Sequence, residues 1–303
     1  MKTALYLVLL LASTTVISFA QTPQQPTETK ASAKHLLGKT SISALRQAPY
    51  AEWFTKNFDD YTPNPEIVTK LSTPDAKRLA AQTSVKIFFG TWCGDSKREV
   101  PRFLKTAQML GLKEEQLELI GVDSGDSTMK RSPSGEERGY DVFRVPTFIF
   151  LQNGKEYQRI TEYPAESHER DFVKIFHRLP YQPNYFSYSH IQEWLQTGVL
   201  ADTNVSVAGL ASHIRRLAPV AYEGELNGCA YVLLARNQVR EAVNVFRINA
   251  TLFPQSSNCW ESLAEGYERL GNKAKAIQCC ERALELDAKN AVALKRLVKL
   301  QTL

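Results

Sequence analysis

The chain has 303 residues, enough for two domains of ordinary size. Its residues are 43% hydrophobic, 23% charged and 10% aromatic, a composition typical of a globular protein with buried cores. The formal net charge of +5 at pH 7 is small and spread along the sequence, which argues against nucleic acid or an anionic membrane surface as a partner.

Residues 1–20 have the pattern of a secretory signal peptide. Lys2 supplies the positive charge, an uncharged Leu- and Val-rich run follows, and Ser18 and Ala20 are the small residues expected before a cleavage site. We expect cleavage after Ala20, secretion or export to the periplasm, and no stable membrane insertion afterwards. An uncleaved N-terminal membrane anchor is the alternative, although the run is short for a span. Residues 21–35 then predict a flexible tether.

Residues 36–78 contain a cluster of aromatic side chains that is followed by two prolines. The cluster consists of Tyr50, Trp53, Phe54, Phe58 and Tyr61. Aromatic residues at such spacing are more often core than binding site, so we expect an N-terminal extension that packs on a sheet. A ligand groove is the alternative.

Residues 79–180 alternate between strand and helix patterns. Strands are predicted at 84–89, 117–122, 147–151 and 156–161, and helices at 96–110 and 168–179. Asn153-Gly154, between the last two strands, is a strong signal for a hairpin turn. This order predicts an α/β fold with a mixed sheet covered by helices.

Beyond residue 180 the chain becomes helical and repeats itself. Residues 181–222 predict a connector with helical segments. From 223 onward, similar residues recur 34 positions apart, as in Ala242 and Ala276, Cys229 and Leu263, and Ala230 and Ala264. This is the period of tetratricopeptide repeats, and the segment resembles that family. The matching signature positions are Trp260, Leu263, Ala264, Tyr267, Ala276 and Ala283.

The resemblance implies two repeats within 223–303, with 291–300 as a capping helix, because a single repeat cannot bury its own apolar face. It also implies a protein partner on the concave face of the repeats. Cys229 and Cys280 take repeat positions that are normally apolar and are expected in the core, whereas Cys259 beside a helix start is expected to be exposed.

Cys93 stands apart from the other four cysteines, where a predicted strand turns into a helix. A thiol at a helix N-terminus faces unpaired backbone N–H groups and the positive end of the helix dipole, and both favour the thiolate. The thiolate is the nucleophile in disulfide exchange. Cys93 is therefore the candidate reactive residue.

The surroundings of Cys93 resemble those of thioredoxins, especially exported bacterial thioredoxin-like proteins. Trp92 precedes the cysteine, Pro101 follows it by eight residues, and Val145-Pro146 precedes a strand where the family places a cis-proline beside the thiol. The resemblance implies a thioredoxin-like fold followed by an all-α tetratricopeptide repeat domain. It assigns Cys93 as nucleophile and Trp92, Gly94, Asp95, Val145 and Pro146 to the substrate groove.

The sequence departs from the thioredoxin pattern at several positions. Ser96 replaces the second cysteine of Cys-x-x-Cys; its hydroxyl can hydrogen-bond the thiolate but cannot resolve a mixed disulfide. The buried carboxylate of the family would fall at Ile87 and is absent. Glu162 stands where many members have glycine and is expected to narrow the groove. Asp95 is expected to cap the helix.

Three functions are consistent with these residues. The first is a monothiol oxidoreductase or isomerase in which Cys93 attacks a disulfide and a protein or glutathione-like thiol resolves the adduct. The second is a redox-inactive module that binds proteins through the groove and the repeats. The third is a peroxide or thiol sensor. No cofactor is implied, and the absence of zinc-ligand spacing predicts no metal site.

Overall fold

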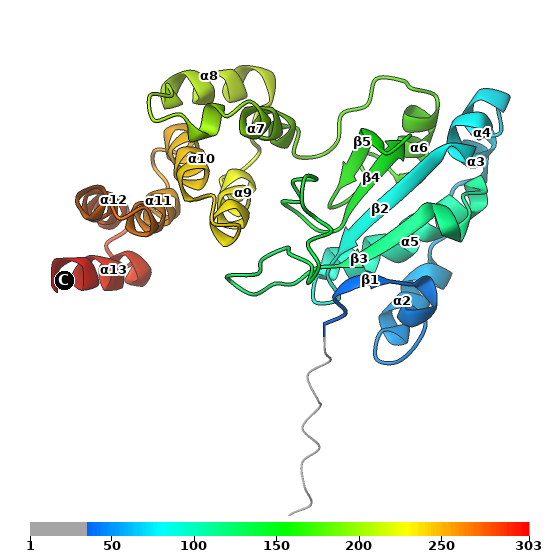
Figure 1. Ribbon diagram of the computed structural model, residues 1–303, viewed down its shortest axis with the longest axis horizontal. Coiled ribbons are helices and arrows are strands. Elements are labelled where there is room, and N and C mark those ends of the chain that lie inside the picture. Colours follow the sequence, from blue (N-terminus) through cyan, green and yellow to red (C-terminus); the bar gives the residue numbers. More distant parts are fainter. Residues whose placement is uncertain (1–34, 303) are drawn as a thin grey trace, which may run out of the picture. The chain divides into compact units, whose positions relative to one another are not determined.

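The computed structural model of the protein describes residues 35–302 (Figure 1). The predicted signal peptide at 1–20 and all of the predicted tether except His35 lie outside the described residues. In the part that is described, no helix is both long enough and apolar enough to cross a membrane.

A five-stranded mixed sheet forms the first half of the described chain. Its strands are β1 (Gly38–Thr40), β2 (Thr83–Phe89), β3 (Leu117–Gly121), β4 (Thr147–Gln152) and β5 (Lys155–Thr161). They lie in the order β1-β3-β2-β4-β5, in which β2 and β3 are parallel and every other pair is antiparallel. The structure confirms the four predicted strands to within one residue at either end.

The hairpin between β4 and β5 is confirmed as well. Asn153 and Gly154 have φ of 52° and 73°, the left-handed conformation that a two-residue hairpin turn requires. The edge strand β1 was not predicted. Three residues are too few to show the alternation by which strands are recognised, and β1 exists because it pairs with the distant β3.

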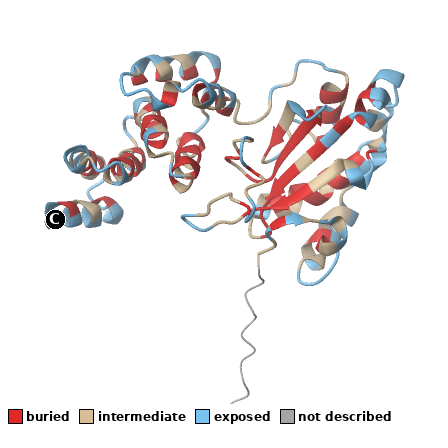
Figure 2. Ribbon diagram, in the orientation of Figure 1, coloured by how far each residue is buried: buried red, intermediate tan, exposed pale blue. Residues whose placement is uncertain are grey.

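Two helices cover one face of the sheet. Side chains of α5 (Gly94–Leu110) and α6 (His168–Phe176) pack with those of β2 and β4 into one apolar cluster. At its centre the rings of Phe103 and Phe148 stack with 4.1 Å between centroids. Figure 2 shows buried residues concentrated along the central strands. On the opposite face, a smaller cluster joins the strands to the loop that precedes β4 and to Trp92 and Cys93.

Helix α6 is shorter than predicted. It ends at Phe176 rather than at Leu179, and the Leu179 side chain is 49% exposed instead of facing the core. Arg178 adopts a left-handed φ of 51°, which breaks the helix. Pro180 follows at once, and a proline disfavours helical backbone in the residue before it.

The N-terminal extension holds four short helices, α1 (Ile42–Leu45), α2 (Ala51–Asp60), α3 (Pro65–Lys70) and α4 (Pro74–Ala81). Helix α2 packs against α5 and brings the aromatic cluster into the main core, where Phe54 is fully buried. The Tyr61 hydroxyl donates to Glu169 Oε2 at 3.0 Å. The aromatic cluster therefore contributes to the core.

The second half of the described chain is helical. Its helices are α7 (Ser187–Gln196), α8 (Val207–Leu217), α9 (Gly224–Ala235), α10 (Val239–Leu252), α11 (Ser257–Arg269), α12 (Lys273–Leu286) and α13 (Ala291–Thr302). Helix α10 packs between α9 and α11, and α12 packs between α11 and α13. The segment predicted as a connector supplies α7 and α8, whose apolar faces belong to the same core as the following helices.

Helix α13 closes the stack less completely than a capping helix should. Ala293 and Leu300 are buried, but Val292, Leu294 and Val298 are each more than 50% exposed. The outer face of a terminal cap is normally polar. Here the last described helix retains an apolar outer side.

All five cysteines lie in the described range, and all are free thiols. Cys229 and Cys280 are fully buried, as expected for core positions. Cys259, expected to be exposed, is only 1% exposed. Ser256 caps α11 by accepting from the Cys259 N–H at 3.1 Å, and the Cys259 thiol then faces Glu223 beside α9 instead of solvent.

Candidate functional site

Cys93 is the N-cap residue of α5, at the end of the turn that leaves β2. Its N–H donates to Gly90 O at 2.9 Å, and its carbonyl accepts from Lys97 N–H at 3.0 Å. A side chain at Gly90 would lie 2.4 Å from the Trp92 ring, so this turn requires glycine. The indole N–H of Trp92 donates to Val122 O at 2.8 Å, which fixes the ring beside β3.

The loop before β4 lies against Cys93. The Val145–Pro146 peptide bond is cis, as the resemblance to thioredoxins implies. The Cys93 thiol donates to Val145 O at 3.2 Å. Val145 and Pro146 are buried, whereas Cys93 and Trp92 are half-buried. The fold thus brings together the two segments that the sequence assigned to one site.

Ser96 lies in the first turn of α5 and is fully buried. Its hydroxyl oxygen accepts from Gly90 N–H at 3.1 Å, so the residue that replaces the second cysteine helps to fix the turn around Cys93. A hydrogen bond from the Ser96 hydroxyl to the thiolate stays a prediction. Gly94, the first residue of α5, is exposed.

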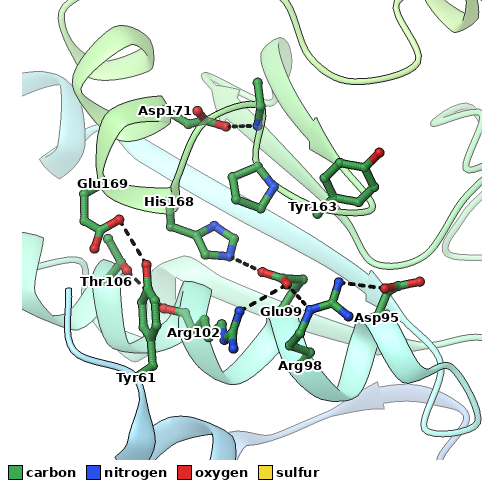
Figure 3. A network of polar contacts seen from close by, with 12 residues as sticks. Tyr61, Asp95, Arg98, Glu99, Arg102, Thr106, Tyr163, His168, Glu169 and Asp171 are labelled. Atoms are coloured by element: carbon green, nitrogen blue, oxygen red, sulfur yellow. Dashed lines mark hydrogen bonds and ion pairs between the residues drawn. The ribbon is translucent and has the colours of Figure 1, made fainter. Parts of the chain in front are cut away.

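Asp95 does not cap the helix as predicted. The N-cap residue is Cys93, and no side chain accepts a capping hydrogen bond there. The Asp95 carboxylate instead pairs with Arg98 at 2.7 Å, because a full positive charge one turn further along is available to it (Figure 3).

The helix that carries Cys93 at its N-terminus also holds a buried carboxylate, although not at Ile87, which is a fully buried core residue. Glu99 lies on α5 and is 4% exposed; its carboxylate contacts His168 Nε2 at 3.0 Å and Arg98 Nε at 2.5 Å (Figure 3). Burial alone would raise the pKa of Glu99, but the hydrogen bonds and charges of His168 and Arg98 outweigh it and leave the pKa below its ordinary value.

Glu162 directly follows β5 and has a left-handed φ of 65°, a conformation that glycine adopts without strain. Its N–H donates to Pro146 O at 2.7 Å. Its carboxylate is held by Arg144 at 3.5 Å and by the Tyr185 hydroxyl. The predicted narrowing of the groove by Glu162 stays a prediction.

The residue before Val145 ties this loop to the helical region. Arg144 donates to Gly224 O at 2.8 Å, to the Tyr222 hydroxyl at 3.0 Å and to the Tyr188 hydroxyl at 3.2 Å. Arg236, which follows α9, donates to Val142 O at 3.2 Å. Sequence reasoning missed both arginines, because nothing local distinguishes them from surface residues.

The loop after β3 forms the remaining side of the site. Asp123 N–H donates to Arg131 O at 2.9 Å and Lys130 N–H donates to Asp123 O at 2.8 Å, which closes the loop on itself. The Lys130 ammonium lies 5.7 Å from the centre of the Trp92 ring. Met129 packs on the helical core, and with Asp126 it borders a small cavity of about 190 Å³. The other lining residues are Tyr231, Leu234, Ala235, Glu265 and Arg269.

The remaining thiols are poorly suited to react. Burial raises the pKa of Cys259 to about 12, of Cys279 to about 12 and of Cys280 to about 11, and it raises that of Cys229 well above the ordinary value. Cys93 is the cysteine of the described chain that is not buried. Among residues 35–302, no three or more His, Cys, Asp or Glu side chains gather as metal ligands would.

The fold and these contacts define a thioredoxin-like domain followed by a helical region with a tetratricopeptide repeat. Residues 257–290 match the tetratricopeptide repeat family, and they include α11 and α12. Over 114 residues, the chain is 27% identical to a probable protein disulfide-isomerase A4 of Caenorhabditis elegans. The matched segment is 37% of this chain and spans only 18% of that relative.

Proposed function

We propose that the protein performs thiol–disulfide exchange through Cys93 alone, on protein substrates bound by its helical repeats. The observation that supports this most is the placement of one accessible thiol at the N-terminus of α5, against the cis-proline loop. The similarity to a probable protein disulfide-isomerase agrees with it.

In the proposed reaction, the Cys93 thiolate attacks one sulfur of a substrate disulfide. A bond forms between Cys93 Sγ and that sulfur, the substrate S–S bond breaks, and its electron pair leaves with the second sulfur as a thiolate. Ser96 carries no thiol that could release the adduct. A second thiol of the substrate, or a glutathione-like thiol, must therefore attack the mixed disulfide and regenerate the Cys93 thiolate.

The helical repeats are proposed to hold the substrate. The first helices of the repeats, α9 and α11, contribute Tyr231 and Glu265 to the cavity that the loop bearing Lys130 also borders. Tetratricopeptide repeats bind protein segments on their concave face.

The test compares the wild type with Ser96→Cys, Ser96→Ala and Cys93→Ser. The wild type should form a stable adduct with oxidised glutathione, detected by intact mass, and should reduce insulin poorly with dithiothreitol. Ser96→Cys should raise the insulin activity at least about tenfold, because resolution becomes intramolecular. Ser96→Ala, which loses the hydrogen bond from Gly90, should keep the adduct and gain no activity. Absence of any Cys93 adduct together with an inert Ser96→Cys variant would refute the proposal.

A redox-inactive binding module is the second candidate, and one observation favours it. Arg144 anchors the loop before Pro146 to the helical region, and the Cys93 thiol already donates to Val145 O. If this candidate is correct, Cys93→Ser leaves partner binding unchanged, and no adduct forms.

A further inference from the structure

We propose that Lys130 is a positioning residue of the site, whose ammonium group acts as the counter-ion of the Cys93 thiolate. This inference rests on the proposed function, because it concerns the reactivity of Cys93. In this proposal, the positive charge that favours the thiolate comes from the loop after β3.

The backbone holds Lys130 in a defined place. Its φ of 53° is left-handed, and its N–H donates to Asp123 O at 2.8 Å. The Thr128 hydroxyl donates to Asp123 Oδ2 at 2.7 Å and braces the same loop. The side chain then extends over the Trp92 indole, with Nζ 5.7 Å from the ring centre, a distance at which an ammonium is attracted to the ring face. Trp92 and Cys93 are adjacent in the chain and pack against the same apolar cluster, so the ammonium lies on the side of the sheet on which Cys93 lies.

The carboxylates near Lys130 are paired with other cations, so the Cys93 thiolate is the anion with which the Lys130 ammonium can pair. The groups that face it are Cys93 at the start of α5, Arg144 before β4, Glu162 after β5 and Arg236 after α9. Glu162 is paired with Arg144 at 3.5 Å. Arg236 is likewise paired with Asp141 at 3.5 Å. Among residues 35–302, Lys130 itself makes no ion pair with a carboxylate.

The titration of Lys130 agrees with this placement. Burial, together with the charges of Arg144 and Arg236, lowers the pKa of Lys130 to about 8, while the charges of Cys93 and Glu162 oppose the change. Lys130 is therefore mostly protonated at neutral pH and loses its charge above about pH 8. Its support of the thiolate should be greatest below that pH.

The experiment follows alkylation of the folded protein by iodoacetamide, a neutral reagent, between about pH 5 and 10. Since the other four cysteines are buried, the rate reports Cys93. Below neutral pH, Lys130→Met should react about tenfold more slowly than the wild type, because a nearby opposite charge changes a thiolate population by about that factor. The two rates should converge at high pH. Lys130→Arg, which keeps the charge, should restore most of the rate.

Lys77→Met is the matched control, because Lys77 is an exposed lysine in α4 and its loss should change nothing. Near-ultraviolet circular dichroism establishes that each variant is folded, and Lys130→Gln replaces Lys130→Met if the latter is not. Equal rates for wild type and Lys130→Met at every pH overturn the inference. A Lys130→Met rate that is lower than the wild-type rate by the same factor at every pH also overturns the inference, because it would indicate that the reagent reaches Cys93 less easily.

A loss seen only with iodoacetate, the anionic reagent, also overturns the inference, since Lys130 would then attract anionic substrates without stabilising the thiolate. Failure of Lys130→Arg to restore the rate overturns it as well. A Cys93 that no reagent modifies in any variant refutes the proposed function itself. The two failures are therefore distinguishable.

Discussion

Glu99→Gln tests how much the buried polar pair between α5 and α6 contributes to stability. The Glu99 carboxylate and the His168 ring are 4% and 1% exposed, and they meet at 3.0 Å (Figure 3). A buried hydrogen bond to a charged group contributes about 1.5–3 kcal/mol. Arg98 and Arg102 also contact Glu99, but their side chains are 42% and 35% exposed, so solvent weakens these two pairs relative to the buried contact with His168.

Glutamine keeps the shape and one acceptor but removes the charge. We therefore expect Glu99→Gln to lower the free energy of unfolding by about 2 kcal/mol at neutral pH. The pKa of Glu99 is lower in the folded protein than its ordinary value of 4.5, so the stabilisation is fully present above about pH 4.5 and is lost as the pH falls through the folded value. The difference between wild type and variant should shrink accordingly in acid.

Urea unfolding at a series of pH values, followed by circular dichroism, measures this difference. Glu114→Gln removes the same charge at an exposed position and should leave the stability unchanged within about 0.5 kcal/mol. A difference between wild type and Glu99→Gln that is the same at pH 7 and at about pH 3 would show that the carboxylate charge contributes nothing. The reasoning about the buried pair would then be wrong.

Two further predictions concern the helical region. Arg144→Met should lower the free energy of unfolding by about 2 kcal/mol in the same urea assay, because it removes three hydrogen bonds to the helical region and leaves Glu162 without its cation. Replacement of an exposed arginine, Arg216→Met, should have no effect. An unchanged unfolding midpoint for Arg144→Met would mean that other contacts hold the loop before Pro146. Truncation after Asn290 removes α13 and with it Arg296, which pairs with Glu261, Glu265 and Glu268. The melting temperature should therefore fall by several degrees. An unchanged melting curve would show that α13 does not close the stack.

The sequence predicted those elements of the fold that neighbouring residues determine. Alternating apolar residues located four strands, Asn153-Gly154 located the hairpin, and the period of 34 residues located the matched repeat. One error arose where distant residues decide, because the strand β1 depends on pairing with β3. The other was local, since α6 ends at the left-handed backbone of Arg178, just before Pro180.

The candidate site also has parts that the sequence predicts and parts that it does not. The position of Cys93 at a helix N-terminus and the proline loop opposite it could be read from the motif and the resemblance. Lys130, Arg144 and Arg236 could not, because each acquires its significance from a partner far along the chain. Within the polar stretch after β3, nothing local marks Lys130 as different from its neighbours.

The burial of four cysteines bears on how this chain must mature. An oxidant that meets the folded protein encounters a single accessible thiol, whereas one that meets the unfolded polypeptide encounters five. Cys279 and Cys280, adjacent in α12, are protected only after that helix has packed against its neighbours. Packing of the helical stack is therefore what separates these four thiols from solvent, since none of the five cysteines is in a disulfide.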